Sequence, residues 1–317
     1  MTDTRLHADP GLAASSTLRV GIDIGGTKTD AVVIDPTGTI VQRLRLATGF
    51  GPDAVLETAV AAVTQLAELA QTGITSFASI GVGIPGAVDN GTGRVTHAVN
   101  LGLEGLELGV ELTRRLGRPV RIDNDVNAAA LGAFHLLEKH ESFSMAYLNL
   151  GTGLAAGIVI DGRVWRGSRG TAGEIGHIPV DPRGPQCPCG QRGCLEMLAS
   201  GSAIARQWPT DDPKPARALF AAAAEGDPLA MEVKTRFVDN VAAAVRILVL
   251  TVDVDSVVIG GGLSSLGPIL LDEVRAVLAS WEAASGFLAS TRLSDRIAIV
   301  PVDFPAAAVG AALVGVA

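Results

Sequence analysis

The chain has few aromatic residues, few cysteines and no excess of positive charge. Phe, Trp and Tyr make up only 4% of its 317 residues, so a buried core has to be built from Ala, Val, Leu and Ile. Acidic residues outnumber basic ones by 33 to 25, and the formal net charge at pH 7 is -8. This charge disfavours nucleic acid and anionic membrane surfaces as the main partners.

The sequence also lacks the patterns that are typical of membrane spans and signal peptides. No apolar run reaches the length of a membrane span without a charge or a turn signal. Residues 1–17 have neither the basic start nor the apolar centre of a signal peptide, and we expect them to form a mobile tail. We therefore predict a cytoplasmic protein, whose thiols stay reduced and free to bind metal.

Hydrophobic residues and glycine are plentiful. Hydrophobic residues make up 48% of the chain, and its length is sufficient for two domains that share a cleft. The 38 glycines gather in short, ordered clusters between apolar runs. Such clusters indicate ligand sites lined by backbone rather than disorder.

All three cysteines lie within eight residues, at Cys187, Cys189 and Cys194, and His177 precedes them. Three thiolates and one imidazole are the ligand set of a closed, structural zinc site. The alternative is a group of unrelated buried cysteines beside a surface histidine. An odd number of cysteines does not suit a disulfide framework. Zinc here would fix the loop that carries Glu174 and Glu196.

The opening residues of the ordered chain predict strands over 18–23, 31–34 and 39–46. Between the first two, Gly25-Gly26-Thr27 would direct backbone N–H groups and a hydroxyl at one point, which suits phosphate. Asp23, at the strand end, is placed to position a hydrated Mg²⁺. Taken alone, these glycines are equally typical of a hairpin turn.

The same pattern recurs over 145–166, with strands predicted at 145–150, 155–160 and 163–166. Gly151-Thr152-Gly153 stands where the first repeat has its glycine turn. We interpret this as an internal duplication that presents two phosphate loops across a cleft.

At three further strand ends the sequence has glycine or polar clusters that are typical of a binding or catalytic site. Gly83-Ile84-Pro85-Gly86 ends a strand predicted at 79–84, and Gly260-Gly261-Gly262 ends another at 256–259. A strand at 119–122 runs directly into polar residues 123–127 and then an Ala-rich helix over 128–137. Helix capping explains one or two of those polar residues, but not four. A carboxylate at such a helix start can accept a proton from a substrate hydroxyl.

The remaining chain is predicted to be mostly helical. Either the helical spacing of apolar residues or a helix-stop signal at the end of the segment supports each prediction. The predicted helices span 53–72, 106–116, 202–207, 215–224, 228–250 and 306–316. A last strand is predicted at 297–300.

From Val20 onward the chain resembles the ROK family of sugar kinases (repressor, open reading frame, kinase), in the hexokinase–actin–heat-shock ATPase superfamily. The matching strings are Asp23-Ile24-Gly25-Gly26-Thr27-Lys28, Gly83-Ile84-Pro85-Gly86, Asn124-Asp125-Val126-Asn127, Leu150-Gly151-Thr152-Gly153, Ala172-Gly173-Glu174-Ile175-Gly176-His177, the cysteine string through Glu196, and Gly260-Gly261-Gly262.

The resemblance implies an α/β protein with a duplicated ribonuclease H-like (actin-like ATPase) fold, in two lobes around a central cleft. Residues 18–123 would form the N-terminal lobe, with a C-terminal helix at 301–317 packing back on it. Residues 124–300 would form the C-terminal lobe with its zinc-binding loop.

The implied activity is transfer of the γ-phosphoryl group of ATP to the 6-hydroxyl of a hexose, with glucose as first choice and Asp125 as general base. The sugar-binding residues implied are Gly86, Asn100, Asn124, Asp125, Glu174, His177 and Glu196. The residues implied to bind Mg-ATP are Asp23, Gly25, Gly26, Thr27, Lys28, Gly151, Thr152, Gly153, Gly261 and Gly262. Structural zinc would be held by His177, Cys187, Cys189 and Cys194.

Other substrates and other functions remain consistent with the sequence. The run Gly102-Leu103-Glu104-Gly105 replaces a loop in which glucose kinases often have Trp, so N-acetylmannosamine, N-acetylglucosamine, fructose and mannose remain possible acceptors, and polyphosphate a possible donor. A sugar-responsive ROK regulator needs a helix-turn-helix, and about 17 residues precede the first strand here. A catalytically inactive sugar sensor is the third reading. Family members commonly form dimers or tetramers, so we expect a homo-oligomer.

Overall fold

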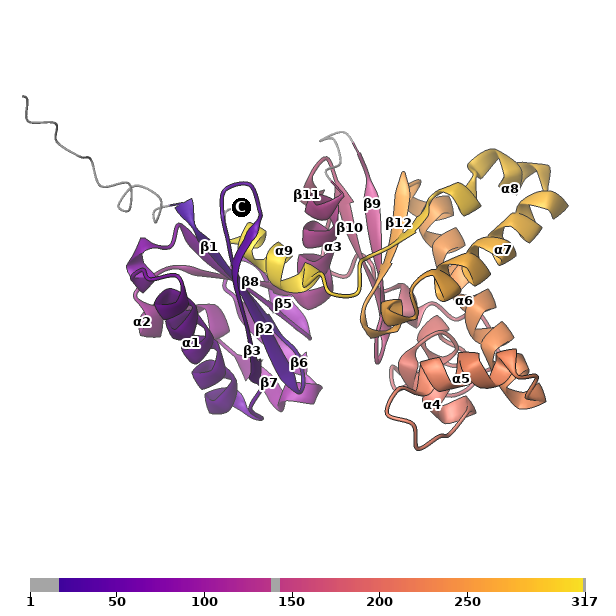
Figure 1. Ribbon diagram of the computed structural model, residues 1–317, viewed down its shortest axis with the longest axis horizontal. Coiled ribbons are helices and arrows are strands. Elements are labelled where there is room, and N and C mark those ends of the chain that lie inside the picture. Colours follow the sequence, from indigo (N-terminus) through magenta and orange to yellow (C-terminus); the bar gives the residue numbers. More distant parts are fainter. Residues whose placement is uncertain (1–16, 138–142, 316–317) are drawn as a thin grey trace, which may run out of the picture. The chain divides into compact units, whose positions relative to one another are not determined.

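The computed structural model describes residues 17–137 and 143–315. Apart from Thr17, the tail predicted at 1–17 lies outside the described residues. The chain divides into two compact units, Met1–Gly132 with Ala307–Ala317, and Ala133–Ala306. Each unit has its own sheet and its own apolar core (Figure 1).

The first unit has a five-stranded sheet in the order β3-β2-β1-β4-β8. Strands β1 (Arg19–Ile24), β2 (Lys28–Ile34) and β3 (Ile40–Ala47) form an antiparallel meander. Strands β4 (Ser79–Ile84) and β8 (Val120–Asn124) extend it in parallel with β1. The parallel strands therefore end at one edge, where ligands of α/β sheets gather.

Helices α1 (Pro52–Leu69) and α2 (Leu108–Leu116) pack with this sheet in one core. Val20, Ile22, Ile80 and Val82 on the strands are buried in that core. Helix α2 is shorter than the predicted helix over 106–116, because Leu106 is the last residue of strand β7. Helix α3 (Asp125–Leu136) follows β8 directly.

A small antiparallel sheet, in the order β5-β6-β7, was not predicted from the sequence. Its strands are β5 (Ala87–Asp89), β6 (Arg94–Ala98) and β7 (Leu103–Leu106). A 3-10 turn, Val99–Leu101, joins the last two strands and places Asn100 at the end of the small sheet.

The sheet of the second unit repeats the topology of the first, in the order β11-β10-β9-β12-β13. Strands β9 (Met145–Leu150), β10 (Leu154–Ile160) and β11 (Arg163–Val164) form the meander, and β12 (Ser256–Gly260) and β13 (Ile297–Ile299) run parallel to β9. Strand β11 ends two residues before the predicted Arg166. The internal duplication inferred from the sequence is confirmed by this order of strands.

The helices of the second unit are α4 (Gly201–Gln207), α5 (Pro215–Ala224), α6 (Pro228–Val252), α7 (Pro268–Ala284) and α8 (Gly286–Thr291). Val241 and Val245 of α6, Val274 of α7, and Leu148 and Val257 of the sheet share its core. Within residues 17–137 and 143–315, none of the helices combines the length and apolar character that crossing a membrane requires.

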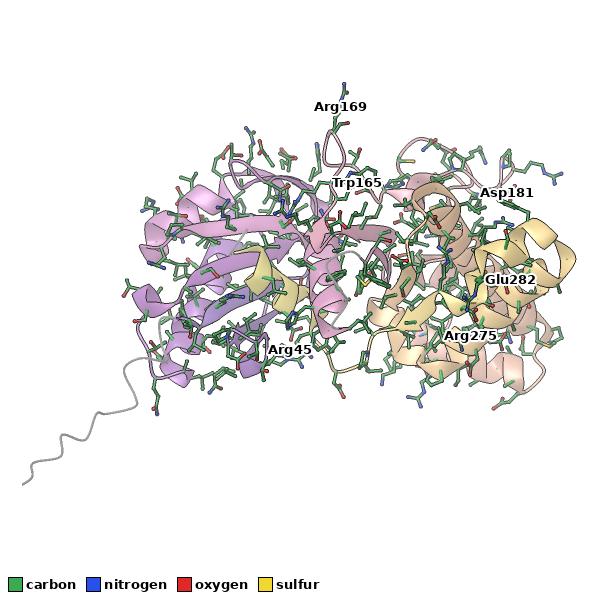
Figure 2. The ribbon with its side chains drawn as sticks, turned by 90° about the horizontal axis from the view of Figure 1, so that it is seen from above. Arg45, Trp165, Arg169, Asp181, Arg275 and Glu282 are labelled. Carbon is green, nitrogen blue, oxygen red and sulfur yellow. The ribbon has the colours of Figure 1, made fainter. Side chains whose placement is uncertain are left out.

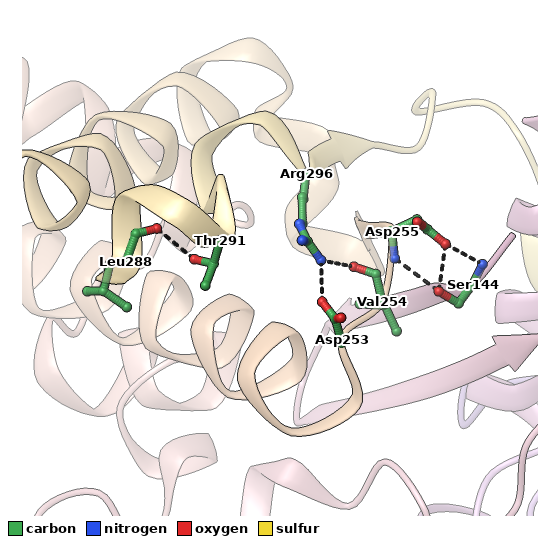
Figure 3. Close-up of polar contacts among 7 residues, drawn as sticks. All are labelled: Ser144, Asp253, Val254, Asp255, Leu288, Thr291 and Arg296. Atoms are coloured by element: carbon green, nitrogen blue, oxygen red, sulfur yellow. Dashed lines mark hydrogen bonds and ion pairs between the residues drawn. The ribbon is translucent and has the colours of Figure 1, made fainter. Parts of the chain in front are cut away.

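Polar contacts fix the ends of strands in the second unit (Figure 3). Asp255 accepts hydrogen bonds from the N–H and hydroxyl of Ser144, at 2.9 and 2.8 Å, and these contacts hold the pKa of its carboxyl below the usual range. Arg296 donates to Asp253 and to the carbonyl of Val254, both at 2.8 Å. The segments that enter β9, β12 and β13 are thereby held together.

Strand β13 is held from helix α7 as well. Two labelled side chains of that helix, Arg275 and Glu282, bind the turn before β13 (Figure 2). Glu282 accepts the N–H and hydroxyl of Ser294 at 3.0 and 2.7 Å, and Arg275 donates to the Ser294 carbonyl at 3.4 Å.

The C-terminal helix α9 (Ala306–Val314) packs against the first unit through glycines. A Cβ added to Gly21 of β1 would lie 1.9 Å from the carbonyl oxygen of Ala308, and one on Gly81 of β4 would lie 1.9 Å from that of Ala311. Only glycine permits so close an approach of helix backbone to strand.

We expect Gly81→Ala to destabilise the protein by about 3 kcal/mol, because the added methyl group has to displace the backbone of α9. Gly286→Ala is the matched control, since a Cβ there meets nothing within 4 Å, and its effect should stay within about 0.5 kcal/mol. Urea unfolding of both variants measures the difference. Equal stabilities would show that α9 does not depend on this contact.

Candidate active site

The junction between β8 and α3 holds the predicted base. Asn124 Oδ1 accepts the N–H of Val126 at 2.9 Å and that of Asn127 at 3.2 Å, so it caps helix α3. The partly buried Asp125 carboxylate accepts the Val126 N–H at 3.0 Å. The start of the helix therefore fixes the direction of this carboxylate and is a favourable place for its negative charge.

Two buried polar residues support this junction. Asp123 is fully buried, and its Oδ1 accepts the N–H of Asn124 at 2.8 Å and the side-chain amide of Asn127 at 3.4 Å. Sequence reasoning gave neither residue a role. Their signal in the sequence was their spacing, since Asn127 follows Asp123 by four residues. One helical turn at the start of α3 brings the side-chain amide of Asn127 back over the end of β8.

Asp23, at the end of β1, belongs to the same acidic group. Burial, in the first place, and then the charges of Asp125 and Asp30 together raise its pKa from 3.8 to about 8, while Lys28 acts in the opposite direction. Asp30 is itself held by Arg45, whose Nε and guanidinium NH2 donate to its two oxygens at 2.8 and 2.9 Å (Arg45 is labelled in Figure 2). Carboxylates this close together suit a divalent cation, which would relieve their repulsion.

The glycine turn and the residues predicted to bind sugar also lie together in the first unit. A Cβ on Gly26 would lie 3.3 Å from the Cβ of Asn100, and one on Gly86 would lie 3.1 Å from the N–H nitrogen of Ala98. The carbonyl of Gly86 accepts the side-chain amide of Asn124 at 3.2 Å. Gly86, Asn100, Asn124 and Asp125 are thus joined through neighbouring strands. Thr27 and Lys28 are exposed beside them.

In the second unit, the ligand atoms of His177, Cys187, Cys189 and Cys194 all lie within 4.8 Å of one another. Sγ of Cys189 lies 3.6 Å from Sγ of Cys194, and Sγ of Cys187 lies 3.8 Å from Nδ1 of His177. Ligands about 2.3 Å from a central zinc in a tetrahedron are separated by about 3.8 Å, so the set fits this ion. Zinc bound at Nδ1 would leave Nε2 of His177 for another partner.

The thiols of this cluster differ in acidity. Hydrogen bonds, first from the Gln191 N–H and then from its side chain, lower the pKa of Cys189 to about 6. Burial raises the pKa of Cys194 to about 12. Because zinc binds thiolates, its binding would release the proton of Cys194.

Two carboxylates lie beside the zinc-type cluster. Glu196 is partly buried, and its Oε2 accepts the N–H of Leu154 at 3.0 Å, directly after the second glycine turn. A Cβ on Gly153 would lie 2.5 Å from the same oxygen, so Gly153 makes room for it. Glu174 is exposed and precedes the 3-10 turn Ile175–His177.

A pocket of about 620 Å³ adjoins the second glycine turn. Gly151, Thr152, Gly262 and Leu263 line it, together with residues of α4 and of the segment entering α5. Gly261 has a φ of 79° and packs against Leu150, where a Cβ would lie 2.6 Å from the carbonyl oxygen. Both predicted glycine clusters of this unit therefore border one pocket, of a size that suits a nucleotide.

Lys214 and Arg217 also line this pocket, and sequence reasoning missed them. Among the described residues neither side chain has a hydrogen-bonding or ionic partner, so both are available to an anionic ligand. Only the alternation of Pro and Lys before α5 hinted at them, and such a pattern is common in surface loops.

The family model that matches this chain is described as the ROK family, and it covers residues 19–312. The chain belongs to the ROK family. The duplicated strand order and the likeness to solved ROK structures confirm the actin-like ATPase fold that the motifs implied.

Two curated relatives of this ROK chain act on different sugars by name. One is a glucokinase of Streptomyces coelicolor, 32% identical over 83% of this chain and 88% of the relative. The other is an N-acetylmannosamine kinase of Vibrio cholerae, 35% identical over 77% of this chain and 83% of the relative. A solved ROK family glucokinase from Streptomyces griseus, in complex with glucose and AMPPNP, is 30% identical with a TM-score of 0.77, covering 94% of this chain and 99% of the other.

Elemental analysis should find about one zinc per ROK chain, because the four side chains complete one tetrahedron. Cys187→Ser should lower the zinc content severalfold. Met197→Leu is the control, since Met197 packs against Cys187 and Cys194 without offering one of the clustered ligands. A Cys187→Ser protein that keeps its zinc would contradict the assignment.

Asp23 makes stability depend on pH. Its folded pKa of about 8 exceeds the usual aspartate value of 3.8, so the folded state holds an extra proton between these values and stability falls as pH rises through that window. In metal-free buffer, Asp23→Asn should therefore stabilise the protein more at pH 8 than at pH 5, as measured by urea unfolding. The gain should shrink in an Asp125→Asn background, and a gain independent of pH would refute the coupling.

Proposed function

We propose that this ROK-family sugar kinase transfers the γ-phosphoryl group of ATP to the 6-hydroxyl of a hexose, with glucose as the preferred acceptor. The observation on which the proposal rests is the Asp125 carboxylate at the start of α3. It shares its unit with the Gly25–Thr27 turn and with Asn100 and Asn124. The glucose and AMPPNP bound to the Streptomyces griseus relative support the choice of both substrates.

Asp125 acts as the general base. Its oxygen accepts the hydrogen of the attacking hydroxyl as the bond to phosphorus forms, a contribution of about 10²–10⁴-fold to the rate. The hydrogen bond from the Val126 N–H at the start of α3 fixes the direction of the carboxylate before the substrate binds. Asn124 and Asn100 bind ring hydroxyls, and Gly86 positions Asn124 through its carbonyl.

The donor is bound mainly by backbone. The turns at Gly25–Thr27 and Gly151–Gly153 present N–H groups and the hydroxyls of Thr27 and Thr152 to its phosphates. The 620 Å³ pocket receives the nucleoside, with Gly262 at its wall and Gly261 next to it in the chain. Mg²⁺, when bound, would offset negative charge on the phosphates, and Asp23 would help to hold it.

The cysteine loop positions the remaining sugar ligands. Zinc bound on the Nδ1 side of His177 leaves Nε2 of that ring for a sugar hydroxyl. Glu174 and Glu196 stand before and after the four predicted zinc ligands in the sequence, and they bind further hydroxyls of the sugar. Reduced thiols favour action in the cytoplasm, and the family resemblance favours a homo-oligomer.

N-acetylmannosamine is the alternative acceptor, because the Vibrio cholerae relative with that activity in its name is 35% identical to this chain. Initial rates with glucose, mannose, fructose, N-acetylmannosamine and N-acetylglucosamine, each with ATP and with polyphosphate, separate the alternatives. We expect the highest kcat/KM for glucose with ATP. A higher value for an N-acetylated sugar would transfer the assignment to that substrate, and no phosphorylation of any sugar would refute the kinase.

Asp125→Asn should reduce kcat by about 10²–10⁴-fold while sugar binding persists, because the amide cannot accept the proton. Asp227→Asn is the matched control, since Asp227 also stands at a helix start, where it accepts the N–H of Ala230 at 2.8 Å. Calorimetry of sugar binding and a coupled assay measure the two effects. Turnover of Asp125→Asn within tenfold of the wild type would exclude Asp125 as the base.

A further inference from the structure

Phe50 is an aromatic side chain in an unusual setting. It lies in the loop between β3 and α1, and 75% of its surface is exposed. Phe77 and Phe237 are, by contrast, fully buried. Phe287, in the other unit, is 67% exposed as well, so exposure alone does not mark a site, and the inference depends on the neighbours of the Phe50 ring.

The loop of Phe50 is bonded to two parts of the proposed site. The N–H of Gly51 donates to the carbonyl of Leu101 at 2.9 Å, in the 3-10 turn that carries Asn100. The N–H of Thr48 donates to the carbonyl of Thr27 at 3.1 Å, in the first glycine turn. The position of the ring is therefore coupled to both the phosphate turn and the sugar turn.

One side of the ring lies over Gly102. A Cβ added to Gly102 would lie 2.7 Å from Cε1 and Cζ of Phe50, and the φ of Gly102 is 68°. Glycine at this position thus permits the turn and the ring contact together. With Gly102 beneath it, the ring keeps most of its surface free.

Asn100 completes the arrangement. It is exposed, its Cβ is 3.3 Å from the position of a Cβ on Gly26, and its side-chain amide has no partner within the described parts of the chain. Val99, 79% exposed, precedes it. An unpaired amide beside an open aromatic surface matches the two faces of a pyranose, which has hydroxyls at its rim and C–H groups on its flat side.

We propose that Phe50 is a specificity-determining residue that binds the C–H face of the hexose while Asn100 binds a hydroxyl at its rim. The inference rests on the proposed function, because it assigns a further contact to the same acceptor. A ring of this kind favours a pyranose whose hydroxyls are all equatorial, because only C–H groups then face the ring. It explains, from the folded chain, how a loop remote in sequence contributes to sugar choice.

The test compares Phe50→Ala with Phe50→Trp and with Phe287→Ala. Phe287 is the matched control, because its side chain is 67% exposed on helix α8 in the other unit. Sugar binding is measured by calorimetry with glucose alone, and kinetics are measured with ATP.

We expect Phe50→Ala to raise both Kd and KM for glucose by about tenfold, with kcat and the KM for ATP within twofold of the wild type. Phe50→Trp should restore binding, and Phe287→Ala should leave it unchanged. If the wild type binds and phosphorylates glucose but Phe50→Ala binds it equally well, the role of Phe50 is refuted and the kinase assignment stands. If the wild type neither binds nor phosphorylates glucose, both the glucose assignment and the role of Phe50 fail.

Discussion

The direct passage from strand β8 into helix α3 is the constraint on which the account depends. Buried Ile122 and Asp123 belong to the sheet, and Asp125 is already the first residue of the helix. Because no loop intervenes, the carboxylate takes its direction from the backbone of two packed elements. Asn124 caps the helix start, and the Asn127 side-chain amide donates to Asp123 at the strand end. If Asp125 is the base, as we propose, a carboxylate held in this way needs no reorganisation when a hydroxyl arrives.

Placing the base there has an electrostatic cost to the fold. Burial and the charges of Asp125 and Asp30 together raise the pKa of Asp23 to about 8. Arg45 compensates the negative charge of Asp30 by donating to both carboxylate oxygens of that residue, and its guanidinium is directed at Asp30 alone. The remaining repulsion is the kind of local conflict that functional sites retain, and a divalent cation bound there would relieve it.

Much of this arrangement could be predicted from the sequence because it depends on local patterns. Three features depend only on residues that are close together in the sequence. They are the strand–glycine–strand repeats, the periodic apolar faces of α1 and α6, and the cysteine cluster. The small sheet β5–β7 escaped prediction because its strands have only three to five residues, interrupted by turn residues such as Gly91 and Gly102. Phe50, Lys214 and Arg217 escaped because single residues in loops have no period, and their roles arise only from contacts between segments distant in sequence. The pairing of Asp30 with Arg45 likewise depends on the register of β2 and β3.

The central claim is that the Asp125 carboxylate faces the hydroxyl that is phosphorylated. A crystal structure with glucose and a non-hydrolysable ATP analogue measures this most directly. The account predicts an Asp125 carboxylate oxygen at about 2.6–3.2 Å from the sugar's 6-hydroxyl, with that hydroxyl directed at the γ-phosphorus. A well-ordered sugar whose 6-hydroxyl is bound by another residue, with Asp125 turned away from every hydroxyl, would contradict it.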